Sequence, residues 1–214
     1  MRRSLAALAC GLLAACNAPD YTPVRDWART ASLVADHPAA TVPPAAQRDG
    51  ILAMQEALAT YLAALARMAD DGVLPYPEDP FVQQAARAAA ADREGAEAVA
   101  GLGAFLRRAT RGNWQAPDLR DSIRTADPLV QALVAALGRA VRGGQPAGEA
   151  GDAVAAYTAA LAAIGEGHAM LKARARDITS EEVARLARAE EDRLRRAARA
   201  LPVPRAAPPT AAAP

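Results

Sequence analysis

Residues 149–176 read EAGDAVAAYTAALAAIGEGHAMLKARAR, and their pattern decides the fold class. Along this stretch a seam of mostly apolar side chains recurs every three or four positions: Val154, Tyr157, Leu161, Ile164, His168, Leu171 and Ala175. A spacing that averages 3.5 residues is typical of helices that pack side by side in a bundle. The stretch therefore predicts a helix with one buried face, and His168 is the out-of-place polar residue on that face.

Three further stretches show the same spacing, and together they predict an all-α fold. They cover residues 45–70, 79–111 and 118–142, and the seam of the second is weaker and built from small side chains. Alanine is abundant and aromatic residues make up only 4% of the chain, which favours helix over sheet. Loops of about six to eight residues would make successive helices antiparallel neighbours. We therefore expect an up-down four-helix bundle.

A proline interrupts one of these stretches. Asp127-Pro128 lies inside residues 118–142, and an aspartate followed by proline is typical of a helix start. Proline inside a helix also removes one backbone hydrogen bond and clashes with the preceding turn. We therefore expect Pro128 to kink this helix, or to split it in two after Thr125.

Two more helices are expected outside the four. An additional C-terminal helix over residues 180–200 has only a sparse apolar stripe, so it should lie against the bundle with one face in water. A short N-terminal helical arm over residues 22–36 should dock on the bundle through Trp27, because buried tryptophan is the usual anchor of such an arm.

The first sixteen residues, MRRSLAALACGLLAAC, have the order of a signal peptide. Two arginines precede an apolar run too short to span a bilayer, and small residues follow it. Leu13-Ala14-Ala15-Cys16 resembles the lipobox of bacterial lipoproteins. The resemblance implies cleavage after residue 15 and acylation of the Cys16 thiol, for example with palmitate. The alternative is an ordinary secretory signal whose cleavage site contains a cysteine.

The same resemblance implies a location. Asn17 stands where aspartate would retain a Gram-negative lipoprotein in the inner membrane. The mature chain is therefore expected at the periplasmic face of the outer membrane, held in the lipid bilayer by the acylated cysteine.

These expectations divide the chain into four parts. They are a signal peptide (1–15), a lipidated tether with the short arm (16–44), a helical bundle domain (45–200) and a Pro/Ala tail (201–214). The tail has too little apolar surface to order itself.

Composition and motifs exclude several classes of function. Without its two leader arginines the chain has a net charge near −1, which gives no basis for binding nucleic acid. Cys16 is the only cysteine left after cleavage, so disulfides and thiolate metal sites are excluded. No nucleophile elbow, phosphate-binding glycine loop or HExxH zinc motif occurs. We expect no enzymatic activity, no catalytic residue, no metal and no resident cofactor.

Two interpretations of His168 remain open. In the first it is a neutral core histidine, hydrogen-bonded to a carbonyl or a carboxylate. In the second it binds haem or a metal ion. In an up-down bundle Met54 would lie level with His168, and such a Met/His pair is similar to the axial ligands of b-type cytochrome bundles.

A group of arginines marks the end of the last predicted helix: Arg193, Arg195, Arg196 and Arg199. Cations there suit the helix dipole, and contact with anionic lipid headgroups or a peptidoglycan stem is the alternative. The sequence as a whole favours a non-enzymatic envelope lipoprotein that binds or scaffolds an envelope protein partner.

Overall fold

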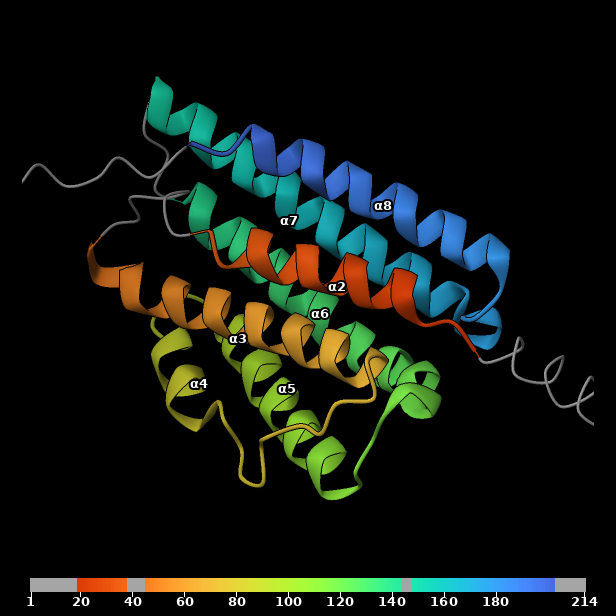
Figure 1. The fold of residues 1–214 in the computed structure, drawn as a ribbon. Helices are drawn as coiled ribbons and strands as arrows, with labels where there is room; N and C mark the ends of the chain where they lie inside the picture. Colours follow the sequence, from red (N-terminus) through yellow and green to blue (C-terminus); the bar gives the residue numbers. More distant parts are fainter. Residues whose placement is uncertain (1–18, 38–44, 144–147, 203–214) are drawn as a thin grey trace, which may run out of the picture.

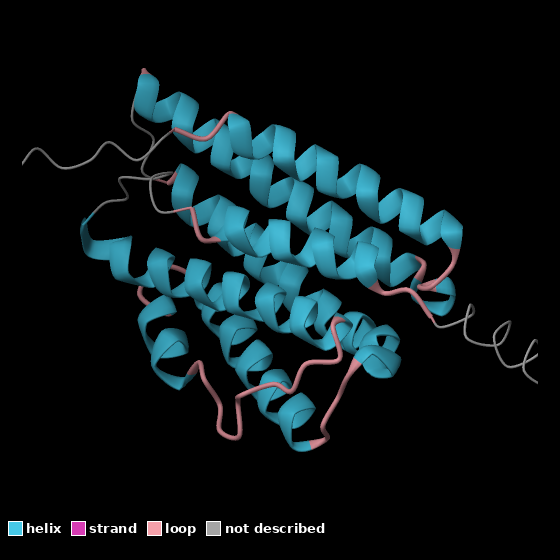
Figure 2. Ribbon diagram, viewed as in Figure 1, coloured by secondary structure: helices cyan, strands magenta, loops and turns pink. Residues whose placement is uncertain are grey.

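The structure is a computed structural model, and it describes residues 19–37, 45–143 and 148–202. Within these ranges it contains helices and loops and no strand (Figure 2), so the predicted all-α class is confirmed. The leader, Cys16, Asn17 and nearly all of the predicted tail lie outside the described residues.

The described helices are close in extent to most of the predicted ones. They are α2 (Thr22–Ala35), α3 (Ala45–Ala69), α4 (Val82–Ala88), α5 (Arg93–Arg111), α6 (Leu119–Arg142), α7 (Glu149–Ala173) and α8 (Glu181–Arg199), with 3-10 turns at Ala116–Asp118 and Ala175–Asp177. None of these described helices combines the length and the apolar character needed to cross a bilayer.

The helices form two layers (Figure 1). Helices α8, α2 and α3 lie side by side in one layer, and α7, α6 and α5 lie side by side in the other. Helix α4 packs against α3 and α5 at one edge. Each layer turns its apolar faces toward the other, so a single core lies between them.

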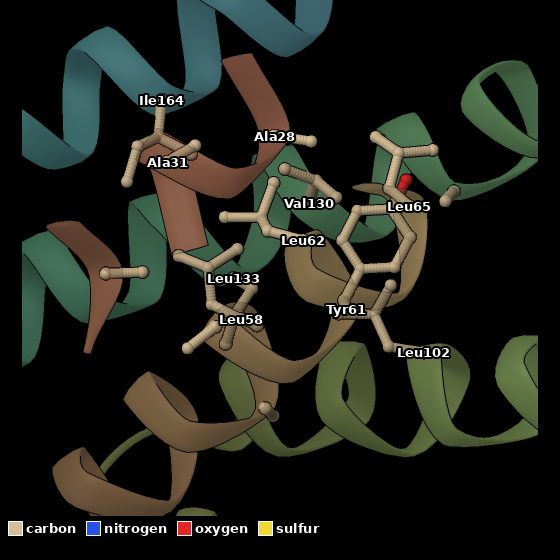
Figure 3. Packing of buried hydrophobic residues seen from close by; sticks show 14 of the residues in the cluster. Ala28, Ala31, Leu58, Tyr61, Leu62, Leu65, Leu102, Val130, Leu133 and Ile164 are labelled. Atoms are coloured by element: carbon tan, nitrogen blue, oxygen red, sulfur yellow. The ribbon is translucent and has the colours of Figure 1, made fainter. Parts of the chain in front are cut away.

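Helix α2 is part of this core, although the sequence analysis predicted a docked arm. Trp27 has no exposed surface, which agrees with its predicted role as an anchor. Ala28 and Ala31 are also fully buried, and Figure 3 shows them near Leu62 of α3. The small alanine side chains let α2 lie between α3 and α8.

Helices α3 and α5 run in the same direction, which the predicted up-down order does not allow. Met54 lies against Gly95, and about two to three turns further along both helices the Tyr61 and Phe105 rings are 5.9 Å apart. The connection between the two helices explains this. Residues 70–81 return along α5, and α4 then reverses the chain before α5 begins.

The predicted helix over residues 79–111 is therefore two helices. Helix α4 ends at Ala88, and α5 is capped by Asp92, whose Oδ1 accepts a hydrogen bond from the Gly95 N–H (2.8 Å). Arg139 of α6 also donates to both oxygens of Asp92. The break is stabilised by this carboxylate, because it satisfies an N–H that has no partner at a helix start.

Helix α6, in contrast, is unbroken from Leu119 to Arg142. The split predicted after Thr125 is wrong. Pro128 has no N–H to donate to the Arg124 carbonyl, four residues earlier. Both residues are exposed, so this carbonyl lies on the solvent side of the helix. Asp127 consequently sits in mid-helix, where it is buried, and does not cap a helix start.

Candidate functional site

Four polar side chains form a connected chain through the core. Tyr61 Oη lies 2.8 Å from His168 Nε2, and His168 Nδ1 lies 3.0 Å from Asp127 Oδ1. Lys172 Nζ donates to the other oxygen of Asp127 at 2.7 Å. Tyr61 and His168 have no exposed surface, whereas the Lys172 side chain is 50% exposed. These four residues, called the charged cluster below, connect the sealed core to solvent.

Three helices supply the charged cluster. His168 and Lys172 are four residues apart on α7, so they share a face and both reach Asp127 on the antiparallel helix α6. Gln131, one turn after Asp127, donates to Asp127 Oδ1 (3.2 Å) and to the Gly165 carbonyl (2.9 Å). Both oxygens of the buried carboxylate are therefore hydrogen-bonded.

The charged cluster keeps Asp127 ionised. The hydrogen bond from His168 is the largest of several effects on the pKa of Asp127. Burial raises this pKa, but the hydrogen bonds from His168, Lys172 and Gln131 together outweigh burial and hold it far below its ordinary value of 3.8. An ionised carboxylate only accepts hydrogen bonds, so His168 Nδ1 carries a hydrogen. In the neutral ring, Nε2 then accepts the hydrogen of the Tyr61 hydroxyl. Burial, and then the charge of Asp127, raises the pKa of Tyr61 well above 10.0.

A second polar group, called the neutral cluster below, lies elsewhere in the core. Gln55 Nε2 donates to Tyr157 Oη (2.7 Å), and the Tyr157 hydroxyl donates to the Ala35 carbonyl (3.0 Å). It joins α3, α7 and the end of α2. Burial is the main reason why the pKa of Tyr157 lies well above 10.0; the hydrogen bond from Gln55 lowers it in part.

A close helix approach places Trp27 beside the charged cluster. The ring centroids of Trp27 and His168 are 6.3 Å apart. A Cβ on Gly167 would lie 2.6 Å from Trp27 Nε1, so only glycine fits at this position of α7 without a shift of the neighbouring helix. The glycine thus allows α2 and α7 to pack tightly around His168.

Met54 and His168 do not form the ligand pair that the sequence analysis considered. His168 contacts Tyr61, which is about two helical turns, or roughly 10 Å, beyond Met54 on α3. The Met54 sulfur packs against Gly95 of α5, and both His168 ring nitrogens have protein partners. These residues do not fit axial ligation of haem. Among the described residues, no group of three or more His, Cys, Asp or Glu side chains is arranged to hold a metal ion.

The Asp-Pro motif predicted the wrong role for Asp127, which is buried in mid-helix. The Asp-Pro pair was interpreted as a helix start, although Ile123 and Val130 flank Asp127 at helical spacing and are both buried. That spacing was a usable signal, because a residue four positions after one buried residue and three before another lies on the same face of a helix as both.

Comparison with known proteins adds no assignment: no family model, curated protein or solved structure matches this chain. The charged cluster must therefore be interpreted from its geometry. Its members are hydrogen-bonded to one another and buried, which is the arrangement of a polar network that holds helices in register.

Proposed function

We propose that this protein is an envelope lipoprotein whose helical domain binds or scaffolds an envelope protein partner without catalysing a reaction. The observation that supports a non-catalytic role is the state of its two histidines. His168 is buried between Tyr61 and Asp127, and His37 Nε2 lies 3.0 Å from the Pro202 carbonyl. Histidine is the usual catalytic base. His168 has no exposed surface and both of its ring nitrogens have protein partners, and one ring nitrogen of His37 is held by a backbone carbonyl.

The charged cluster suits a scaffold. It connects α3, α6 and α7 through hydrogen bonds that are satisfied only in one register of these helices. A rigid domain of this kind presents a constant surface to a partner. Little conformational freedom is then lost on binding, which favours the complex.

The proposed anchor lies close to this domain in the chain. Thr22, the first residue of α2, follows Cys16 by six positions. An extended linker of that length spans at most about 20 Å. Acylation of Cys16 would thus hold the start of α2 next to the outer membrane, at its periplasmic face.

The anchor is tested by labelling cells with radioactive palmitate. We expect Cys16→Ser to abolish incorporation, because it removes the thiol that is acylated, and the protein to leave the membrane fraction or to remain unprocessed. Cys10→Ser is the matched control and should be labelled as strongly as the wild type. Unchanged labelling of Cys16→Ser would refute the lipoprotein assignment.

The partner is tested separately. Cross-linking in intact cells followed by purification should recover the same envelope protein from wild type and from Cys10→Ser. Repeated recovery of no partner would argue against the binding role while leaving the anchor untouched. Asn17→Asp should move the protein toward inner-membrane fractions, which tests sorting alone.

A further inference from the structure

Three arginines and a tryptophan form a basic surface at the end of α5. Arg107, Arg108 and Arg111 are exposed, and together with Trp114 they line a hollow of about 550 Å³. The Arg108 guanidinium carbon lies 6.0 Å from the centroid of the Trp114 ring. In the described part of the chain these three arginines form no ion pair; Arg111 donates to the Pro77 carbonyl instead (3.2 Å). This group is called the Arg/Trp surface below.

Local packing holds the tryptophan in place. The Trp114 ring packs edge-on against Phe105, with ring centroids 5.8 Å apart. Gly112 leaves room for it, because a Cβ there would lie 2.6 Å from Trp114 Nε1. Asn113 adopts a left-handed conformation (φ 50°) that turns the chain back, and the Trp114 N–H donates to the Ala109 carbonyl (3.0 Å). The ring is therefore part of a built surface at the helix end.

The Arg/Trp surface lies at the end of the molecule where α2 begins. Arg25 in the first turn of α2 binds Asp70 at the end of α3 (2.9 Å). The neighbouring Asp71 accepts a hydrogen bond from the Ala116 N–H, two residues after Trp114 (3.2 Å). These contacts connect the start of α2, the end of α3 and the segment after α5 at one end of the two layers.

The arginines at the end of α8 lie at the opposite end. Helix α8 runs parallel to α2, because Thr30 contacts Glu191 and His37 contacts Pro202. The end of α8 is therefore beside the end of α2, roughly 28 Å along the helix from where α8 begins. A membrane that held the residues just before α2 would therefore lie at the end of the molecule that carries the Arg/Trp surface, and the end of α8 would lie at the far end.

We propose that the Arg/Trp surface rests on the headgroups of anionic phospholipids in the bilayer that carries the Cys16 anchor; this rests on the proposed lipoprotein function. Guanidinium groups bind phosphate oxygens through paired hydrogen bonds, which ammonium groups do not. Tryptophan favours the interface between headgroups and acyl chains, since its ring is apolar and its N–H is polar. A second membrane contact near the tether would fix the orientation of the domain on the bilayer.

The test uses a chain that starts at Asn17, which keeps every described residue and lacks the acylated cysteine. Sedimentation with phosphatidylcholine vesicles that contain phosphatidylglycerol should bring this chain down, and salt should weaken the binding. The triple variant Arg107→Gln/Arg108→Gln/Arg111→Gln should bind about a hundredfold more weakly. The matched control, Arg195→Gln/Arg196→Gln/Arg199→Gln, removes three cations from the far end and should bind like the wild type.

Tryptophan fluorescence adds an independent readout. Trp27 is fully buried, so quenching by brominated lipid reports on Trp114, and we expect quenching in the wild type but not in the Arg107/Arg108/Arg111 variant. Equal binding by both triple variants, or no binding of the wild type to anionic vesicles, would overturn the proposal. Inorganic phosphate at equal ionic strength should not release the protein; complete release by phosphate would identify a free-anion site and overturn the membrane contact. Palmitate labelling of full-length Cys16→Ser reports the anchor separately.

Discussion

The charged and the neutral cluster perform the same mechanical task with different chemistry. Each uses a tyrosine hydroxyl to connect α3 with α7 across the core: Tyr61 with His168 in one, Gln55 with Tyr157 in the other. Polar side chains, rather than close backbone packing, therefore set the register of these two parallel helices. The clusters differ in that only the charged one contains an ionised group, the buried Asp127.

This difference predicts unequal energetic consequences. Removing a partner from a neutral hydrogen bond leaves an unsatisfied dipole, which costs about 1–3 kcal/mol. Removing the ionised acceptor that several donors share breaks more than one charge-assisted hydrogen bond, each worth about 1.5–3 kcal/mol. The two clusters can be compared directly, because both lie in the same core and are measured in the same unfolding experiment.

The largest effect is expected from Asp127→Ala. It removes the ionised acceptor of His168, Lys172 and Gln131, so three hydrogen bonds are lost at once and the free energy of unfolding should fall by about 3–5 kcal/mol in urea denaturation. Tyr157→Phe in the neutral cluster should lower it by only about 1–3 kcal/mol. Asp192→Ala, an exposed change on α8, should stay within about 0.5 kcal/mol of wild type. Equal losses for Asp127→Ala and Tyr157→Phe would remove the distinction between the clusters.

His168→Leu should be destabilising by about 1–3 kcal/mol, because it removes a hydrogen-bond partner from two buried groups. The change leaves the Tyr61 hydroxyl and one Asp127 oxygen without the histidine partner. A double-mutant cycle with Tyr61→Phe measures the contact itself and should give a coupling of at least about 0.5 kcal/mol. Tyr61→Phe combined with Tyr157→Phe should be additive. A stabilised His168→Leu variant would show that the charged cluster contributes nothing to stability.

The smallest and most specific effect concerns pH. The folded-state pKa of Asp127 lies below its ordinary value of 3.8, so its contribution is present above about pH 4 and is lost as pH falls through the folded-state pKa. The acid slope of unfolding free energy, up to about 1.4 kcal/mol per pH unit for one group, should be shallower in Asp127→Asn.

The free energy of unfolding at alkaline pH tests both clusters at once. Burial raises the pKa of Tyr61 and Tyr157 above 10.0 in the folded state, so stability is present below about pH 10 and falls above it as the unfolded tyrosines ionise. Tyr61→Phe and Tyr157→Phe should each reduce the loss of stability above about pH 10. Neither should change the loss of stability at acid pH that depends on Asp127. For the acid prediction, the contradicting result would be an acid dependence of the unfolding free energy that Asp127→Asn leaves unchanged. Other carboxylates with a lowered pKa, such as Asp70, would then be its main cause.

Much of the secondary structure was predictable because it depends on local periodicity. The 3.5-residue seam identified α3 and α7, and the size of Trp27 identified the anchor of α2. The break between α4 and α5 was not predictable in this way. Alanines occupy residues 88–91 on both sides of it, and alanine favours helix at every one of these positions. The break is stabilised by Asp92, whose carboxylate is held by Arg139 from another helix.

The sequence by itself determined the helical class and the extents of α3, α7 and α8, since each follows from a pattern within a few turns of chain. Tertiary structure decided the parallel course of α3 and α5, the place of α2 in the core and the role of Asp127. An Asp-Pro pair has the same local preference at a helix start and in mid-helix. What separates the two for Asp127 is contact with His168 and Lys172, which are more than forty residues away in the chain and adjacent only in the folded protein.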